Sequence, residues 1–142
     1  MSALPVTISA ATDEEVRSGA LGNQLREFNY HHVGEYPLAL PIRLNAKDDA
    51  GQLVGGIRAF VFLQWLRVEV LWVAEAVRGQ GLGTRLLAQA EQEARDAGAI
   101  GSALETFGWQ APDFYRKLGY EEAGRIQNYV KGYDLLTMSK RL

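Results

Sequence analysis

The stretch from Val68 to Ala97 constrains the fold more than any other part of this chain. Its first part, up to Ala74, is rich in Val, Leu and Trp and predicts a strand of a central sheet. A turn with glycines at positions 79, 81 and 83 leads into Gly81–Ala97, whose apolar residues fall on one face and predict an amphipathic helix. Free N–H groups and the helix dipole make such a helix start suitable for anions. The stretch therefore predicts an α/β chain that binds a phosphate group.

Further strands and helices are predicted on both sides of this stretch. Thr12 and Glu15 have the spacing of a capping box and predict a helix that extends toward Tyr30, although Gly19 weakens it. Asp48–Gly51 is typical of a hairpin turn. The other predicted elements are strands at Val6–Ser9, Ile42–Asn45, Leu53–Phe62, Trp65–Ala74, Ser102–Phe107, Glu121–Ile126 and Tyr133–Arg141, and a short helix at Pro112–Gly119. This order predicts a mixed sheet of about seven strands flanked by helices, in a single domain over residues 1–142.

Composition excludes several classes of protein. The chain has no cysteine, which rules out disulfides, thiolate metal sites and a cysteine acyl-enzyme. A net charge of −2 argues against a general nucleic-acid binder. No apolar run approaches the roughly 18 residues that cross a bilayer, and Met1–Pro5 lacks the basic start of a signal peptide. A cytoplasmic protein with no membrane partner is therefore expected.

Two common phosphate motifs can be tested against the glycine-rich turn by their spacing. A Walker A loop needs Gly-Lys followed by Ser or Thr, and the chain has no Gly-Lys pair. A dinucleotide fingerprint needs a third glycine, but the position is Thr84 when counted from Gly79 and Leu86 when counted from Gly81. The pattern that remains is Arg/Gln-x-x-Gly-x-Gly/Ala, which Arg78–Gly83 matches.

With this loop the sequence resembles the GNAT superfamily of N-acetyltransferases, whose pyrophosphate loop has that pattern between the fourth strand and the third helix. A second match follows about 30 residues on, where Ala111–Tyr120 resembles the family segment A-x-x-F-Y-x-K-x-G-F/Y. The resemblance implies a sheet that is splayed between its fourth and fifth strands. Two positions depart from the pattern, because Glu75 replaces a frequent proline and Gly108 a frequent asparagine. The second departure removes one expected coenzyme contact.

The resemblance also implies acetyl-coenzyme A as the co-substrate. The main-chain N–H of Val73 is then the expected donor to the thioester carbonyl, and Arg78 adds a charged contact to the phosphates. No metal is expected, because adjacent His31 and His32 do not share a face. The expected coenzyme-binding residues are Leu71, Trp72, Val73, Arg78, Gly79, Gln80, Gly81, Leu82, Gly83, Thr84, Phe114 and Lys117.

Three residues are candidates for proton transfer. The resemblance assigns Tyr115 as the general acid, and a tyrosine hydroxyl can donate to a thiolate without carrying charge. Glu69, which interrupts an apolar strand, and Glu105, near the end of the next, are candidate bases, and a route through water alone stays open. Tyr129 and Tyr133 are expected to shape the acceptor pocket from the closing strands, and Trp109, between Thr106 and the Tyr115 helix, is the tryptophan with the best claim to a functional role.

Three functions remain after this comparison of motifs. The first is transfer of acetyl to a primary amine of a small molecule, by direct attack in a ternary complex. The second is acetylation of a lysine or N-terminus in a protein or peptide. The third is a non-catalytic sensor of acyl-coenzyme A, against which the presence of both the loop and Tyr115 argues. Homodimers are frequent in this superfamily, so a homodimer is compatible with each function.

Overall fold

The computed structural model describes residues 3–142, which form two compact units. The first unit ends at Tyr36, and the second is Pro37–Leu142. Helices α1 (Asp13–Arg17) and α2 (Ala20–Val33) make up the regular structure of the first unit. None of the helices among the described residues has the length and apolar character needed to cross a membrane.

The start of α1 confirms the predicted capping box. The Glu15 N–H donates to Thr12 Oγ1 at 3.2 Å, and the Thr12 N–H donates to Glu15 Oε1 at 2.9 Å. Gly19 then adopts a φ of +70°, which interrupts the helical path and makes it the N-cap of α2. The single helix predicted here is therefore two consecutive helices.

The strand predicted at Val6–Ser9 is wrong. This segment has no regular structure, and the side chains of Val6 and Ile8 are 82% and 96% exposed. A strand is stable only when a neighbouring strand pairs with its backbone, and none of the described strands pairs with this segment. The sheet consequently has six strands instead of about seven.

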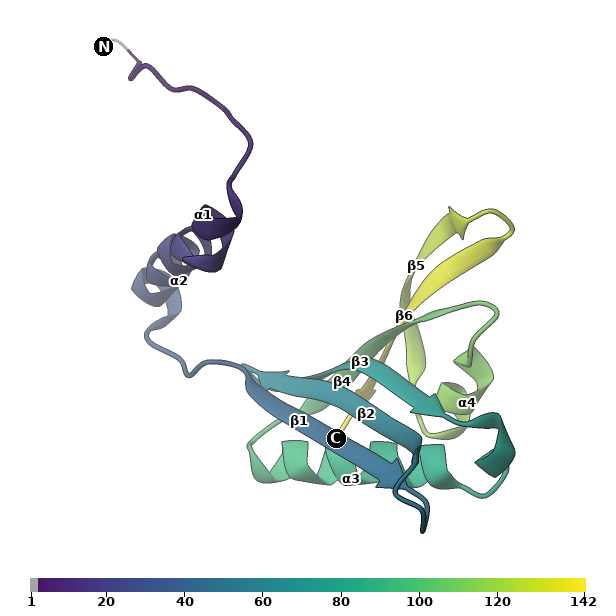
Figure 1. Ribbon diagram of the computed structural model, residues 1–142. Coiled ribbons are helices and arrows are strands. Elements are labelled where there is room, and N and C mark those ends of the chain that lie inside the picture. Colours follow the sequence, from purple (N-terminus) through teal and green to yellow (C-terminus); the bar gives the residue numbers. More distant parts are fainter. Residues whose placement is uncertain (1–2) are drawn as a thin grey trace. The chain divides into compact units, whose positions relative to one another are not determined.

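The sheet of the second unit has the strand order β1-β2-β3-β4-β6-β5 (Figure 1). Only β3 and β4 pair in parallel, and every other neighbouring pair is antiparallel. The hairpin predicted at Asp48–Gly51 joins β1 to β2, and Asp48 Oδ1 accepts hydrogen bonds from two N–H groups of the turn. The strands are β1 (Leu40–Lys47), β2 (Leu53–Phe62), β3 (Trp65–Val73), β4 (Gly101–Phe107), β5 (Glu121–Val130) and β6 (Tyr133–Arg141).

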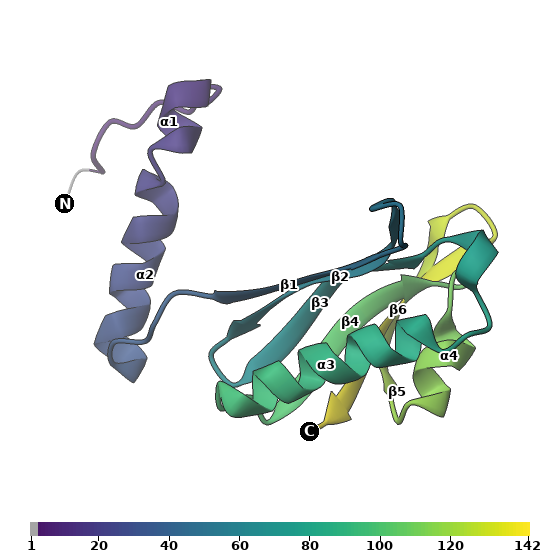
Figure 2. The same cartoon turned by 60° about the horizontal axis from the view of Figure 1, so that its bottom comes forward.

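Helix α3 (Leu82–Asp96) lies along one face of the sheet, as Figure 2 shows. Leu86, Leu87, Ala90 and Ala94 are buried against it, which confirms the face predicted from the 3.6-residue period. This contact forms the main core of the unit, and it holds the glycine-rich start of α3 directly after β3.

Helix α4 (Pro112–Lys117) is anchored by a buried polar group that the sequence patterns did not predict. The Tyr120 hydroxyl, just beyond α4, donates to Glu91 Oε2 at 2.8 Å and accepts from Ser102 Oγ at 2.7 Å. Lys140 Nζ lies 3.1 Å from the other oxygen of Glu91. Burial and the nearby Glu91 carboxylate both raise the pKa of Tyr120. The group thus connects α3, β4, β6 and the end of α4 through a buried carboxylate with several partners.

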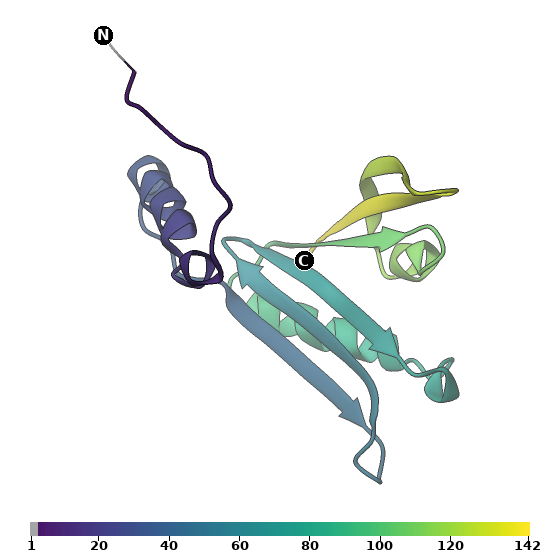
Figure 3. The ribbon, with the colours of Figure 1, turned by 45° about the horizontal axis from the view of Figure 1, so that its top comes forward.

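The β3–β4 ladder covers only the first part of the two strands. Pairing ends at Val68 and Leu104, although β3 continues to Val73 and β4 to Phe107. Figure 3 shows the two strands diverging as β3 runs toward the short 3-10 helix η1 (Glu75–Val77) and β4 runs toward α4. The splay expected from the family resemblance is therefore present.

Candidate active site

A β-bulge lies where β3 and β4 begin to separate. Arg58 pairs with Val70 and Ala59 pairs with Val68, so Glu69 is an extra residue without a partner on β2. Bulges redirect side chains and end regular pairing, and they are common beside active sites. Both Glu69 and the next residue are exposed, which breaks the alternation of the strand. The bulge thus lies at the point where the cleft opens.

The cleft between the separated strands is a cavity of about 250 Å³. It is lined from β3, from β4 and from the start of α4. Glu69, Glu105 and Tyr115 all line it, so the three residues predicted for proton transfer share one cavity. The arrangement places two carboxylates and one phenol around a small space.

Tyr115 has the environment of a neutral hydrogen-bond donor. It is 8% exposed, and its ring packs edge-on against Phe114 at 5.1 Å and Tyr120 at 5.7 Å. Burial raises the pKa of Tyr115 above its ordinary value, because the phenolate would lose solvation. Within residues 3–142 its hydroxyl makes no hydrogen bond, and Tyr115 lines both the cleft and the larger cavity beside it. The proton of this hydroxyl therefore remains available to a ligand.

The larger cavity has a volume of about 720 Å³ and runs along the glycine-rich loop. Ten of the residues expected to bind the coenzyme line it, while Gln80 and Lys117 do not. The ten are Leu71, Trp72, Val73, Arg78, Gly79, Gly81, Leu82, Gly83, Thr84 and Phe114. Residues that come from β3, the loop and α4 are thus brought to one cavity.

The loop has the geometry of a backbone anion site. Gly79 and Gly81 have φ values of +80° and +79°, a conformation that side chains other than glycine rarely adopt. Gly81 is the N-cap of α3 and makes no side-chain capping bond, so the first N–H groups of the helix remain available to a ligand. A Cβ on Gly83 would lie 3.3 Å from Phe114 Cζ, which shows how closely α4 approaches this end of α3.

The backbone of Val73 is directed into the splayed region. The Ala74 N–H donates to the Val54 carbonyl at 2.8 Å, and Gly55 pairs with Val73. Because hydrogen-bonded and non-hydrogen-bonded pairs alternate in an antiparallel ladder, the N–H and C=O of Val73 point away from β2. Arg78 Nε donates to this C=O at 3.1 Å. The Val73 N–H therefore points away from β2, toward the splayed region.

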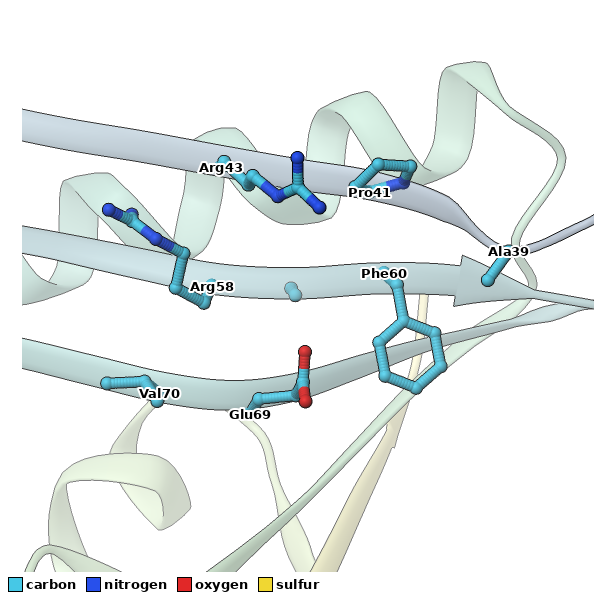
Figure 4. A pocket seen from close by; sticks show the side chains of 8 residues that line it. Ala39, Pro41, Arg43, Arg58, Phe60, Glu69 and Val70 are labelled. Atoms are coloured by element: carbon cyan, nitrogen blue, oxygen red, sulfur yellow. The ribbon is translucent and has the colours of Figure 1, made fainter. Parts of the chain in front are cut away.

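A third cavity, of about 610 Å³, lies on the sheet over β1, β2 and β3. Figure 4 shows the Glu69 carboxylate beside the Phe60 ring, with Arg43 and Arg58 projecting from the neighbouring strands. Arg58 is held by the Asn45 side chain, to which its Nη2 donates at 2.8 Å. Glu69 lines both this cavity and the cleft, because the bulge lies at their boundary. The sequence patterns gave no signal for this cavity, since its residues are far apart along the chain.

The histidines do not form a metal centre with other described residues. His31 and His32 lie on α2, and His32 Nδ1 lies 3.0 Å from the Phe28 carbonyl oxygen. Across residues 3–142 no three His, Asp or Glu side chains gather as metal ligands.

Comparison with known proteins identifies the family. Residues 43–122 match the model of the acetyltransferase (GNAT) domain. Blasticidin-S acetyltransferase of Streptomyces morookaense is 45% identical over 98 residues, which cover 68% of this chain and 72% of that protein. The matched region includes the loop, the cleft and α4.

Two crystal structures show the same fold. An acetyltransferase from Bacillus cereus has a TM-score of 0.87 and 29% identity, over 96% of this chain and 98% of its own. A Bacillus anthracis protein, named as a streptothricin acetyltransferase and crystallised with acetyl-coenzyme A, has a TM-score of 0.64 and 26% identity, over 80% of this chain and 68% of its own. Together with the domain match, these similarities show that the chain belongs to the GNAT family of acetyltransferases.

Proposed function

We propose that this enzyme transfers the acetyl group of acetyl-coenzyme A to a primary amine of a small molecule, by direct attack in a ternary complex. One observation carries the proposal: Tyr115 lines both the loop cavity and the cleft that holds Glu69 and Glu105. The loop cavity and the cleft thus meet at the protonated hydroxyl of Tyr115. A coenzyme in the loop cavity and an amine in the cleft would therefore come together beside this hydroxyl.

The residues of the loop cavity fit the coenzyme. Backbone N–H groups at the start of α3 suit the pyrophosphate, and Arg78 supplies the positive charge beside them. The edge of β3 near Val73 suits the amide groups of the pantetheine arm, because beyond Val68 no strand pairs with β3 on the cleft side. Bound acetyl-coenzyme A would supply the thioester. The Val73 N–H would then donate to its carbonyl oxygen and make the carbon more electrophilic.

The residues of the cleft fit the proton transfers that the reaction needs. The amine nitrogen forms a bond to the carbonyl carbon while the carbon–sulfur bond breaks. Glu69 or Glu105 takes the proton that the amine loses, directly or through water, and Tyr115 donates its proton to the departing sulfur. The Tyr115 hydroxyl is suited to this role because burial keeps it protonated.

The size of the cleft and the similar proteins support a small-molecule acceptor. A space of about 250 Å³ accommodates a primary amine and the carbons next to it. The relatives named for blasticidin-S and for streptothricin are also consistent with such an acceptor. A protein substrate would instead require an open groove across the cleft.

An acceptor screen tests this function. Free thiol released from acetyl-coenzyme A would be measured with blasticidin S, streptothricin, polyamines, simple alkylamines and lysine peptides. Acetylation of one or more small amines, with peptides at least tenfold poorer in kcat/KM, is expected. Exclusive use of peptides would overturn the proposal. Tight binding of acetyl-coenzyme A by calorimetry, with no turnover of any amine or peptide, would instead indicate a sensor.

A further inference from the structure

Four aromatic side chains form an exposed cluster at the end of β4, which we call the aromatic platform: Phe107, Trp109, Tyr129 and Tyr133. Phe107 and Trp109 stack with their centroids 4.4 Å apart and their planes 9° from parallel. Tyr129 contacts Phe107 at 5.6 Å, and Tyr133 meets Trp109 edge-on at 5.0 Å. Trp109, Tyr129 and Tyr133 nevertheless remain 49%, 57% and 45% exposed. The rings are ordered by one another and still present a large surface to solvent.

The platform is continuous with the candidate active site. Glu105 and Phe107 are two residues apart on β4, so their side chains lie on the same face about 7 Å apart along the strand. The intervening Thr106 is buried on the other face. Trp109 also lines the loop cavity together with Tyr115. An acceptor whose amine lies in the cleft is therefore within reach of these rings.

Hydrogen bonds that Asp134 accepts hold the segments that carry the rings. The Gly108 N–H, between Phe107 and Trp109, donates to the Asp134 carbonyl at 3.1 Å. The Asp134 carboxylate accepts from the Asn128 N–H at 3.0 Å and from Arg125 at 2.8 Å, both on the strand that carries Tyr129. These bonds lower the pKa of Asp134, so the carboxylate remains charged and bonded at neutral pH. The exposed rings are thus pre-organised, which lowers the entropic cost of stacking a ligand on them.

We propose that the acceptor has a flat unsaturated ring, which stacks on the aromatic platform while its amine lies in the cleft. This inference rests on the proposed function and specifies its substrate class. The negative charge of Glu69 and Glu105 complements the ammonium end of the acceptor. The exposed faces of the platform's aromatic rings complement an unsaturated ring of the acceptor. Such a ring stacks on aromatic side chains more favourably than a saturated ring of the same size.

A matched pair of amines tests the inference: 3-phenylpropylamine and 3-cyclohexylpropylamine, which differ only in the ring. The aromatic amine should have a kcat/KM roughly three- to tenfold higher, as expected for one or two aromatic contacts. Tyr133→Leu and Tyr129→Leu should bring this ratio close to one while leaving the KM for acetyl-coenzyme A unchanged. Tyr133→Phe, which keeps the ring, should retain the ratio. Trp109 is left intact because it also lines the loop cavity.

The outcomes separate this inference from the function on which it rests. Equal turnover of both amines, or a preference for the saturated ring, would overturn the stacking role and leave acetyl transfer standing. A preference that survives both leucine variants would also overturn it. A change confined to the KM of acetyl-coenzyme A would assign the platform to the coenzyme. If no amine in the wider screen were turned over, both the function and the inference would fail.

Discussion

Arg78 donates a hydrogen bond from Nε to the carbonyl oxygen of Val73 at 3.1 Å. The first residue of the phosphate loop is thereby tied to the last residue of β3, whose N–H points into the splayed region. The terminal guanidinium nitrogens of Arg78 make no hydrogen bond to any other residue in the described part of the chain. A single side chain can therefore hold the loop in place and present charge to a phosphate group.

Replacing Arg78 tests this double role. Arg78→Ala should raise the KM for acetyl-coenzyme A roughly tenfold or more, as expected for losing a hydrogen bond from a charged group. Arg78→Lys should restore the KM only in part, because lysine keeps the positive charge but lacks the planar guanidinium group with its several N–H donors. Steady-state kinetics with varied coenzyme measure the effect. Arg95→Ala, at the far end of α3, is the matched control and should behave as the wild type.

The Tyr115 hydroxyl should contribute to chemistry and not to coenzyme binding. Tyr115→Phe keeps the buried ring but removes the proton, so kcat should fall by roughly 10²- to 10⁴-fold. The Kd for acetyl-coenzyme A, measured by calorimetry, should change less than about twofold. The raised pKa of Tyr115 keeps the acid protonated, so wild-type kcat should show no loss from this group below about pH 10. An unchanged kcat in Tyr115→Phe would remove it from the mechanism.

The two carboxylates of the cleft, Glu69 and Glu105, should contribute unequally to catalysis. Glu69→Gln is expected to reduce kcat/KM for the amine by roughly 10- to 100-fold at pH 7, because the bulge turns Glu69 toward the cleft and the adjoining cavity. Glu105→Gln should have a smaller effect. Glu93→Gln, on an exposed part of α3, controls for loss of negative charge. If neither cleft variant differed from that control, proton removal would proceed through water alone.

The buried Tyr120 hydroxyl should stabilise the fold. Tyr120→Phe leaves Glu91 without one donor and Ser102 without its acceptor, at a cost of roughly 1–3 kcal/mol in the free energy of unfolding. Urea denaturation at pH 8 measures this cost. A Tyr120→Phe variant as stable as the wild type would show that these hydrogen bonds make no net contribution to the free energy of unfolding.

The raised pKa of Tyr120 should also make the folded protein less stable at alkaline pH. Burial and Glu91 raise the pKa of Tyr120 in the folded state, whereas the unfolded tyrosine ionises near the ordinary value of 10.0. The difference between the folded and the unfolded pKa stabilises the protein fully below pH 10. As the pH rises above 10, this contribution to the free energy of unfolding is lost, at up to about 1.4 kcal/mol per pH unit. Between pH 10 and 11 the wild type should therefore lose stability more steeply than Tyr120→Phe. Parallel slopes would contradict the assignment.

Short-range patterns determined most of the secondary structure and the glycine-rich loop before α3. The capping box at Thr12, the hairpin at Asp48–Gly51 and the helix after Gly81 each depend on interactions between residues a few positions apart. The loop was recognisable because glycine spacing and a following amphipathic helix suffice to present N–H groups to an anion. These features are encoded locally, so one sequence was enough to predict them.

Only the tertiary structure decided the features that depend on distant partners. Val6–Ser9 has strand-forming residues but pairs with none of the described strands, and Glu91 is buried on α3 because Tyr120 and Lys140 contact it from other elements. The position of Glu69 in a bulge follows from the register of β2 against β3, which sequence periodicity does not specify. The sequence alone thus determined the glycine-rich loop before α3 and the types of residue that are candidates for catalysis. The convergence of Glu69, Glu105 and Tyr115 on one cleft was decided by strand pairing, because burial and hydrogen bonding between distant segments select the register.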